Sequence, residues 1–169
     1  MPVLGGSLRR LAGLRGSDAR WSPDGKKVLF AQGQSLYLAG KDGSEPHPLV
    51  DVSGPADWLR WSPDGKVIRF SLTNSKDNTT ALWEVSADGT NLRPLLPGWN
   101  FPPRECCGDW TADGKYFLFH STRGGVTTVW SLREKERFWR KTSHTPAPLT
   151  FGQMATGWPL PCPDRKSVV

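Results

Sequence analysis

Long apolar runs are the first thing this sequence lacks. No apolar segment among its 169 residues approaches the roughly 20 that span a bilayer, so we expect no membrane span. The opening residues MPVLGGSLRRLAGLRG include arginines but no uninterrupted apolar stretch of about 7 to 15 residues, and they do not resemble a secretory signal. The expectation is a cytoplasmic protein if the chain is complete, and a periplasmic one if it belongs to a longer envelope or sensor protein.

Recognisable catalytic motifs are also missing. The sequence has no Gly-x-Ser-x-Gly elbow, no His-Glu-x-x-His, no Cys-x-x-Cys and no phosphate-binding loop. Its histidines, His47, His120 and His144, have no carboxylate or cysteine partner at a catalytic or ligand spacing. We therefore expect a protein that is not an enzyme, with no catalytic residue, no cofactor and no bound metal.

Cysteine is scarce, and two of the three residues, Cys106 and Cys107, are adjacent. Such a pair can close a vicinal disulfide under oxidation, but without further Cys or His at ligand spacing it makes a poor metal site. Of the two alternatives, we favour two small, half-buried residues in a loop over the disulfide.

Positive charge is in excess, with a formal net charge of +6 and a pI near 9.5. The basic residues are scattered, and the one local cluster, REKERFWRK at 133–141, is interrupted by glutamates. A solvated hairpin tip explains such a segment better than a polyanion site, so we expect no direct nucleic-acid binding.

What the sequence does contain is a repeat. RWSPDGK occurs at 20–26 and at 60–66, and DWTADGK follows at 109–115. Proline presets φ at the second turn position, aspartate adopts the backbone conformation of the third, and glycine accepts positive φ at the fourth. These residues predict a tight turn between antiparallel strands. The repeat residues are Trp21, Pro23, Asp24, Gly25, Trp61, Pro63, Asp64, Gly65, Trp110, Asp113 and Gly114.

The residues after each glycine alternate as a strand does. The third and fifth places are always apolar, whereas the place between them holds Leu29, Arg69 or Leu118. We expect one face of this strand to be buried and the other to be free to vary. Third strands are expected at 35–40, 81–87 and 128–133, and fourth strands ending at 48–50, 94–96 and 148–150.

The tryptophan of the motif recurs after 40 and then 49 residues, at Trp21, Trp61 and Trp110. Four strands in such a length are typical of a propeller blade. The predicted fold class is all-β, a partial, open β-propeller of three four-stranded antiparallel blades with an extra N-terminal strand and an incomplete fourth blade. The expected boundaries are 1–14 (outer strand of a preceding blade), 15–52, 53–98 and 99–152 (blades one to three) and 153–169 (start of a degraded fourth blade).

Propellers usually close a ring of four to eight blades, because closure protects their edges. Three blades leave open sheet faces that favour association. The expected partners are a protein, the remaining blades of a larger propeller, or a second copy meeting the open blade edges.

The tryptophans divide into two groups. Trp21, Trp61 and Trp110 are expected to begin first strands and to be buried between sheets, as are Trp83 and Trp130 in the third strands. The loop between blades two and three contains Trp99, Phe101, Arg104 and Glu105, residue types that suit a binding hot spot. The alternative, which we favour, is that this loop caps the hydrophobic end of the blade.

The repeated WSPDGK, ADGT at 87–90 and FHSTRGG at 119–125 followed by VW resemble the WD-repeat-like propeller repeat of the TolB family. That resemblance implies an interaction platform, a substrate-gating domain of prolyl-oligopeptidase-like peptidases, or the C-terminal propeller of bacterial winged-helix regulators. In combination, the segments LRGSDARWSPDGK, LWEVSADGTNLRPLLPGWN and ECCGDWTADGKYF are most similar to the last group. The resemblance therefore implies a non-catalytic binding module, a fragment of a larger propeller or of the sensor half of a transcriptional regulator. The alternative is an accessory propeller of a hydrolase whose catalytic domain lies outside this chain.

Overall fold

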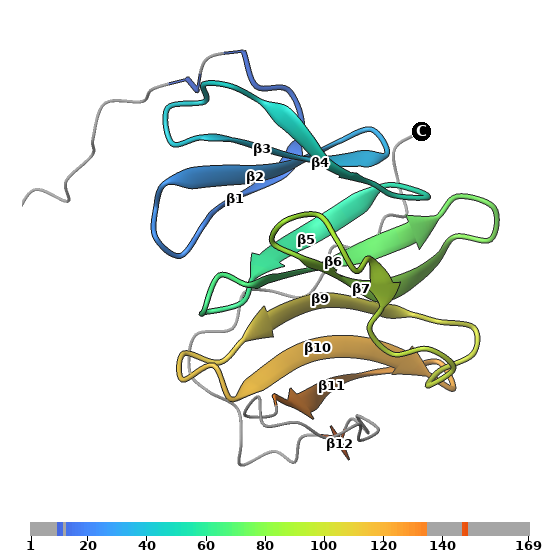
Figure 1. Ribbon diagram of the computed structural model, residues 1–169. Coiled ribbons are helices and arrows are strands. Elements are labelled where there is room, and N and C mark those ends of the chain that lie inside the picture. The colour runs from blue at the N-terminus through green and yellow to red at the C-terminus, as the bar shows by residue number, and fades with distance from the viewer. Residues whose placement is uncertain (1–9, 12, 135–146, 149–169) are drawn as a thin grey trace, which may run out of the picture.

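Three four-stranded antiparallel sheets, stacked face to face, make up the described part of the chain (Figure 1). The computed structural model describes residues 10–11, 13–134 and 147–148. Within each sheet the strands follow one another in sequence order. This open, propeller-like arrangement confirms the predicted fold class. The expected outer strand in 1–14 falls mostly, and the degraded blade in 153–169 wholly, outside the described residues.

The strands have the following bounds. The first sheet contains β1 (Ser17–Trp21), β2 (Lys27–Gln32), β3 (Ser35–Gly40) and β4 (His47–Asp51). The second contains β5 (Ala56–Trp61), β6 (Val67–Asn74), β7 (Thr79–Ser86) and β8 (Arg93–Pro94). The third contains β9 (Glu105–Trp110), β10 (Tyr116–Arg123), β11 (Val126–Arg133) and β12 (Ala147–Pro148). Over the described ranges, the structure has no helix long and apolar enough to cross a membrane.

The side-chain hydroxyl of the first residue closes the repeated turn, a role that was not predicted from the sequence. The Ser22 hydroxyl donates to Asp24 Oδ1 at 2.6 Å and accepts from the Lys27 amide at 2.9 Å. The Lys26 amide donates to Asp24 at 3.1 Å, and the Gly25 amide to the Ser22 carbonyl at 2.8 Å. The hydrogen bond from Ser22, followed by that from the Lys26 amide, holds the pKa of Asp24 below its ordinary value. Corresponding bonds recur at Ser62, Asp64, Lys66, Val67, Thr111, Asp113, Lys115 and Tyr116.

The turns also contact one another across the sheets. They lie along the left edge in Figure 1. A Cβ added at Gly65 would lie 3.8 Å from the Pro23 ring, and one added at Gly114 would lie 3.2 Å from Cγ of Pro63. The glycine of one turn therefore packs on the proline of the preceding turn. At Gly114 this close approach, together with a φ of +68°, disfavours any residue with a side chain.

Both faces of the second strand of each sheet are buried, which corrects the expectation of one variable, free face. Leu29, Arg69 and Leu118 are all buried. Leu29 belongs to a core cluster that joins the first two sheets, and this cluster includes Ile68 and Phe70 on the opposite sheet. For the second sheet the cause is the stacking, because it lies between the other two: Ile68 and Phe70 pack in the core shared with the first sheet, and Arg69 on the other face pairs with Glu134, which follows β11 of the third.

The motif tryptophans end the first strands rather than beginning them. Trp61 packs against the core between the first two sheets, and Trp110 against the core between the second and third. Trp21, by contrast, is 52% exposed, so the prediction that it is buried is wrong. Each of these tryptophans faces the preceding sheet, and no described sheet precedes the first.

A buried ion network connects the second and third sheets. Arg69 on β6 pairs with Glu84 on β7 at 2.9 Å and with Glu134, and Glu84 also accepts from Arg93 at 2.7 Å. The Arg69 guanidinium also lies 4.8 Å from the ring centroid of Trp110. Burial alone would raise the pKa of Glu84, but the two arginines outweigh it, and the pKa lies below the ordinary 4.5.

Candidate functional site

The connection between β8 and β9 forms a rigid loop at the edge of the sheets opposite the repeated turns. Trp99 in this loop packs edge-on against Trp130, with ring centroids 4.8 Å apart, and against Phe119 at 5.7 Å. Arg123 covers its outer face at 4.5 Å and donates to the Trp99 carbonyl at 2.9 Å. Trp99 therefore caps the hydrophobic end of the third blade.

Glu105 supports the loop from inside the protein. It is 2% exposed, and its Oε1 accepts from Asn100 Nδ2 at 2.8 Å and from the Arg104 amide at 3.3 Å. Asn100 also donates to Ser121 and to the Thr122 carbonyl, both at 3.2 Å. Glu105 is thus a residue that positions the loop rather than one that meets a partner.

The main chain of the loop is attached to two sheets. The Thr80 amide on β7 donates to the Pro103 carbonyl at 3.3 Å, and the Thr122 amide on β10 donates to the Arg104 carbonyl at 3.1 Å. Between these fixed points and Trp99, the side chain of Phe101 is 95% exposed, and Arg104 is exposed as well. Of the four candidate binding residues, the structure therefore leaves Phe101 and Arg104 on the surface.

An open cavity of about 420 Å³ lies beside this loop. Pro103 of the loop and Lys76 form part of its wall. The other lining residues are Ser53, Leu72, Asn74, Thr79, Ala81 and Trp83. We call Phe101, Arg104 and this cavity the loop face. The hairpin carrying Lys76 also carries Asp77, but its carboxylate already accepts from the Thr79 hydroxyl and amide, which lower its pKa.

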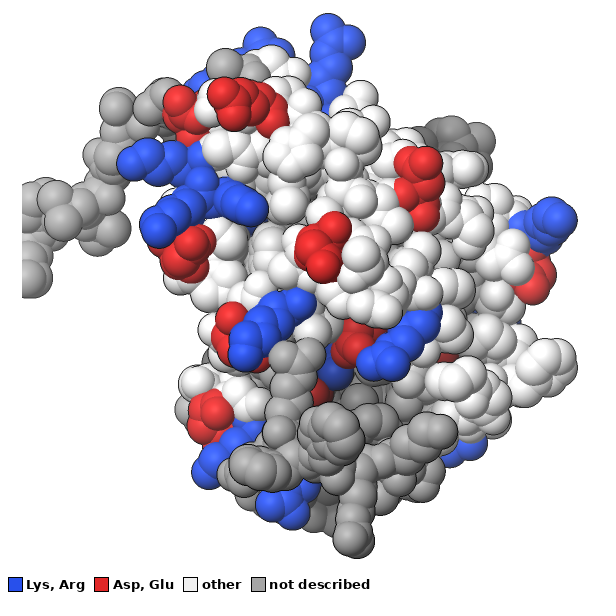
Figure 2. Space-filling view, viewed as in Figure 1, with Lys and Arg blue, Asp and Glu red and all other residues white. Residues whose placement is uncertain are grey.

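Charge does not separate by sign on the visible face of the molecule. Figure 2 shows basic and acidic side chains interspersed over it. Most of the basic segment at 133–141 lies outside the described residues. The described surface in this view therefore offers no broad single-sign patch of the kind that nucleic acids require.

A second repeated feature, not found from the sequence, is a bulge in every first strand. Three residues before each motif tryptophan the backbone has positive φ, at Asp18 (42°), Trp58 (57°) and Cys107 (62°). The side chains at this position differ. Asp18 accepts from the Leu59 amide at 2.7 Å and so links the first two sheets, whereas Cys107 lies in a disulfide. The bulge is thus architectural, and the chemistry placed on it varies.

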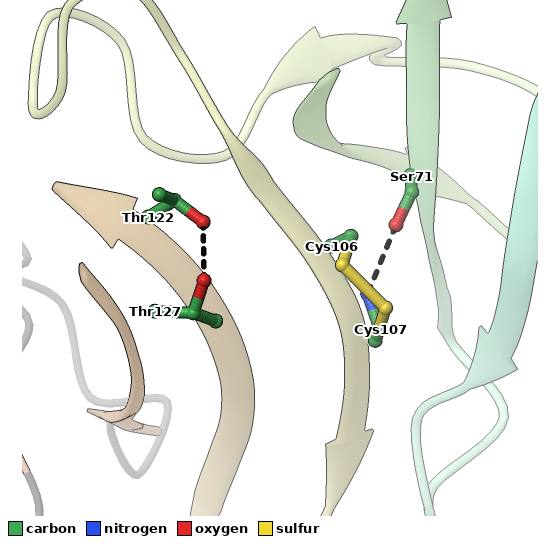
Figure 3. Close-up of a disulfide and its surroundings, with 5 residues drawn as sticks. All are labelled: Ser71, Cys106, Cys107, Thr122 and Thr127. Atoms are coloured by element: carbon green, nitrogen blue, oxygen red, sulfur yellow. Dashed lines mark hydrogen bonds between the residues drawn. A yellow bond between two sulfur atoms is a disulfide. The ribbon is translucent and has the colours of Figure 1, made fainter. Parts of the chain in front are cut away.

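Cys106 and Cys107 form a vicinal disulfide on β9 (Figure 3). The favoured alternative of two small residues in a loop was therefore wrong. Strand pairing places His120 of β10 opposite Cys106, so the expectation that no histidine has a cysteine partner also needs correction. Burial lowers the pKa of His120 below its ordinary 6.5. Across the sheet boundary, the Cys107 amide donates to Ser71 Oγ at 3.2 Å.

Several solved propeller structures are similar to this chain. TolB from Acinetobacter baumannii matches with a TM-score of 0.59 and 20% identity over 79% of this chain and 31% of its own. Kuenenia stuttgartiensis hydrazine synthase matches with a TM-score of 0.57 and 20% identity over 80% of this chain and 42% of its own. The tricorn protease matches with a TM-score of 0.53 and 9% identity over 68% of this chain and 13% of its own.

These likenesses show the fold alone, since fold does not determine function. No protein-family model and no curated protein matches the sequence. The chain spans less than half the length of each of these three structures. The described blades are therefore part of a propeller similar to those of TolB and of proteases.

Proposed function

We propose that this chain is a non-catalytic binding module of a larger propeller and that it docks a protein segment on the loop face. The observation that carries the proposal is the loop itself. Trp99, Asn100 and the Pro103 and Arg104 carbonyls are fixed to the blades, whereas Phe101 is almost fully exposed. Because the main chain on either side of Phe101 is already fixed, the loop needs little further ordering on binding, and aromatic side chains are enriched at protein interfaces.

The chemistry of the loop face specifies the partner segment. Lys76 and Arg104 are exposed cations, and apolar residues such as Leu72 and Trp83 line the cavity. An extended segment with one apolar side chain for the cavity and a carboxylate for the cations complements this surface. An exposed rim charge of this kind contributes to association rate and specificity more than to affinity.

A display selection with random peptides tests the proposal. Peptides are selected on the wild-type chain, and their binding to Phe101→Ser and to Trp21→Ser is then measured. Trp21 is a matched control, since it is an exposed aromatic residue outside the loop face. We expect enriched peptides that combine acidic and apolar residues and bind Phe101→Ser at least tenfold more weakly than Trp21→Ser. Peptides that bind both variants equally would refute the proposal.

The wider context we propose is the sensor half of a transcriptional regulator, which the sequence resemblance to winged-helix regulators supports. A second candidate is an accessory propeller of a hydrolase, which the similarity to part of the tricorn protease favours. The adjoining coding sequence distinguishes the two, because a winged helix supports the first and a nucleophile elbow supports the second.

A further inference from the structure

Cys106, Cys107 and His120 form a cluster that the repeat does not explain. Their ligand atoms, two sulfurs and an imidazole nitrogen, all lie within 4.8 Å of one another. The equivalent strand pairs are Ser17 with Ala31 in the first blade and Asp57 with Ser71 in the second. Since the other two blades fold with different residues at these positions, the fold of the third blade does not require its three metal-ligating side chains.

The bulge brings the two sulfurs together. Neighbouring side chains on a regular strand point to opposite faces of the sheet, but the positive φ of Cys107 interrupts this alternation. The disulfide shows that both sulfurs reach the same place (Figure 3). Cys107 is buried, whereas Cys106 and His120 are partly exposed. An ion can therefore approach from the side of Cys106 and His120.

Structural stabilisation is a poor explanation for this disulfide. A cross-link stabilises a fold mainly by closing a loop in the unfolded chain, and the effect grows with the length of the loop. Cys106 and Cys107 are one residue apart, so their bond closes almost no loop. The pair is better explained by the chemistry of its sulfurs.

We propose that Cys106, Cys107 and His120, once the disulfide is reduced, bind a single thiophilic d¹⁰ cation of the Zn²⁺ class. A dithiol reductant supplies two electrons and two protons by thiol–disulfide exchange, and it leaves as its own disulfide while the chain gains two thiols. The cation then displaces the two thiol protons. Two thiolates and a neutral imidazole nitrogen form three of the four ligands that such ions take, and water occupies the fourth position.

This inference is independent of the proposed docking function. The loop face does not include the cluster, and each proposal has its own experiment.

The test uses the full chain with Cys162→Ser, so that Cys106 and Cys107 are the only thiols. The protein is reduced with a phosphine, desalted without oxygen and titrated with Cd²⁺, whose bonds to thiolate absorb in the ultraviolet. We expect one Cd²⁺ per reduced chain with sulfur-to-cadmium absorption, competition by Zn²⁺, and neither signal for the oxidised chain. Binding of equal strength to the oxidised chain, or no absorption on titration of the reduced chain, would overturn the proposal.

His120→Ser separates a site that includes the histidine from one made by the thiols alone. Serine is the residue at the equivalent position of the second blade, and an unchanged β spectrum and melting temperature verify folding. Loss of an outer-shell partner of a ligand weakens metal binding roughly 10–100-fold, and loss of the ligand itself should weaken Cd²⁺ binding at least as much. An unchanged Cd²⁺ affinity in folded His120→Ser would refute the three-ligand site.

Discussion

The ion pair between Arg69 and Glu84 occupies a position that another blade fills with leucines. Arg69 pairs with Glu84 across β6 and β7, and the equivalent cross-strand pair on β2 and β3 is Leu29 with Leu38. All four residues are buried. The leucine pair of the first blade therefore suggests the apolar replacement to test, the double variant Arg69→Leu/Glu84→Leu.

The single variant Arg69→Leu should be strongly destabilised. It leaves the Glu84 carboxylate buried beside Arg93, whose side chain is largely exposed. Removing one partner of a buried pair costs about 3–5 kcal/mol, whereas replacing both by apolar residues is often neutral or stabilising by about 1–4 kcal/mol. The double variant should therefore recover most of the stability that the single variant loses. Glu134 and Arg93 lose their partners in it, but both reach water.

Urea unfolding at pH 7, followed by tryptophan fluorescence, measures both variants through the linear dependence of the free energy on denaturant. Arg20→Leu, at an exposed arginine of β1, is the control, and a change within about 0.5 kcal/mol is expected for it. A double variant no more stable than Arg69→Leu would refute the reasoning, because the cost would then not come from burying the Glu84 carboxylate without Arg69.

Three further expectations concern the repeat, the third blade and acid. Ser62→Ala removes the hydroxyl that closes its turn and should lower the free energy of unfolding by about 1 kcal/mol; an unchanged urea midpoint would contradict this. Gly108→Ala places a Cβ against the ring of Phe117 and should lower the free energy of unfolding by about 1–3 kcal/mol. The double variant Gly108→Ala/Phe117→Ile, which has the residue found at Ile68 of the second blade, should recover part of this loss. Thermal melting of both variants measures this, and equal losses of stability in the two would count against it. The pKa of Glu84 is depressed on folding, so its contribution to stability is present above about pH 4.5 and is lost as the pH falls through the lower folded value. Urea unfolding at several pH values should show that Glu84→Gln reduces the dependence of stability on pH in this range. An unchanged dependence on pH would contradict the assignment to Glu84.

The strands and turns were predictable from sequence because their causes are local. Ser-Pro-Asp-Gly fixes a turn through residues that are neighbours in the chain, and alternation marks the strand that follows. The exposure of Trp21 was not predictable in this way, since it depends on which sheet stands next to the first one.

The candidate site was predicted less well for the same reason. Phe101 and Glu105 were both predicted to contact a partner, but Glu105 is buried and its carboxylate accepts hydrogen bonds from Asn100 and Ser121. His120 seemed isolated because the spacing along the chain does not show which residue lies across the sheet. Pairing β9 with β10 outward from the turn would have brought it near Cys106, although the bulge shifts that register.

The contact between Pro63 and Gly114 gives the stack of blades a direction. The first two blades present a proline, Pro23 or Pro63, to the glycine of the next turn, whereas the third blade has Ala112 at that place. The interface between blades is therefore head-to-tail rather than two-fold symmetric. The two ends of the described stack consequently differ, with Gly25 at one end, where an added Cβ would meet nothing within 4 Å, and exposed Ala112 at the other. If one end of this stack meets the opposite end of a second copy, the contact is heterologous, and it produces a ring where the rotation closes and a filament where it does not.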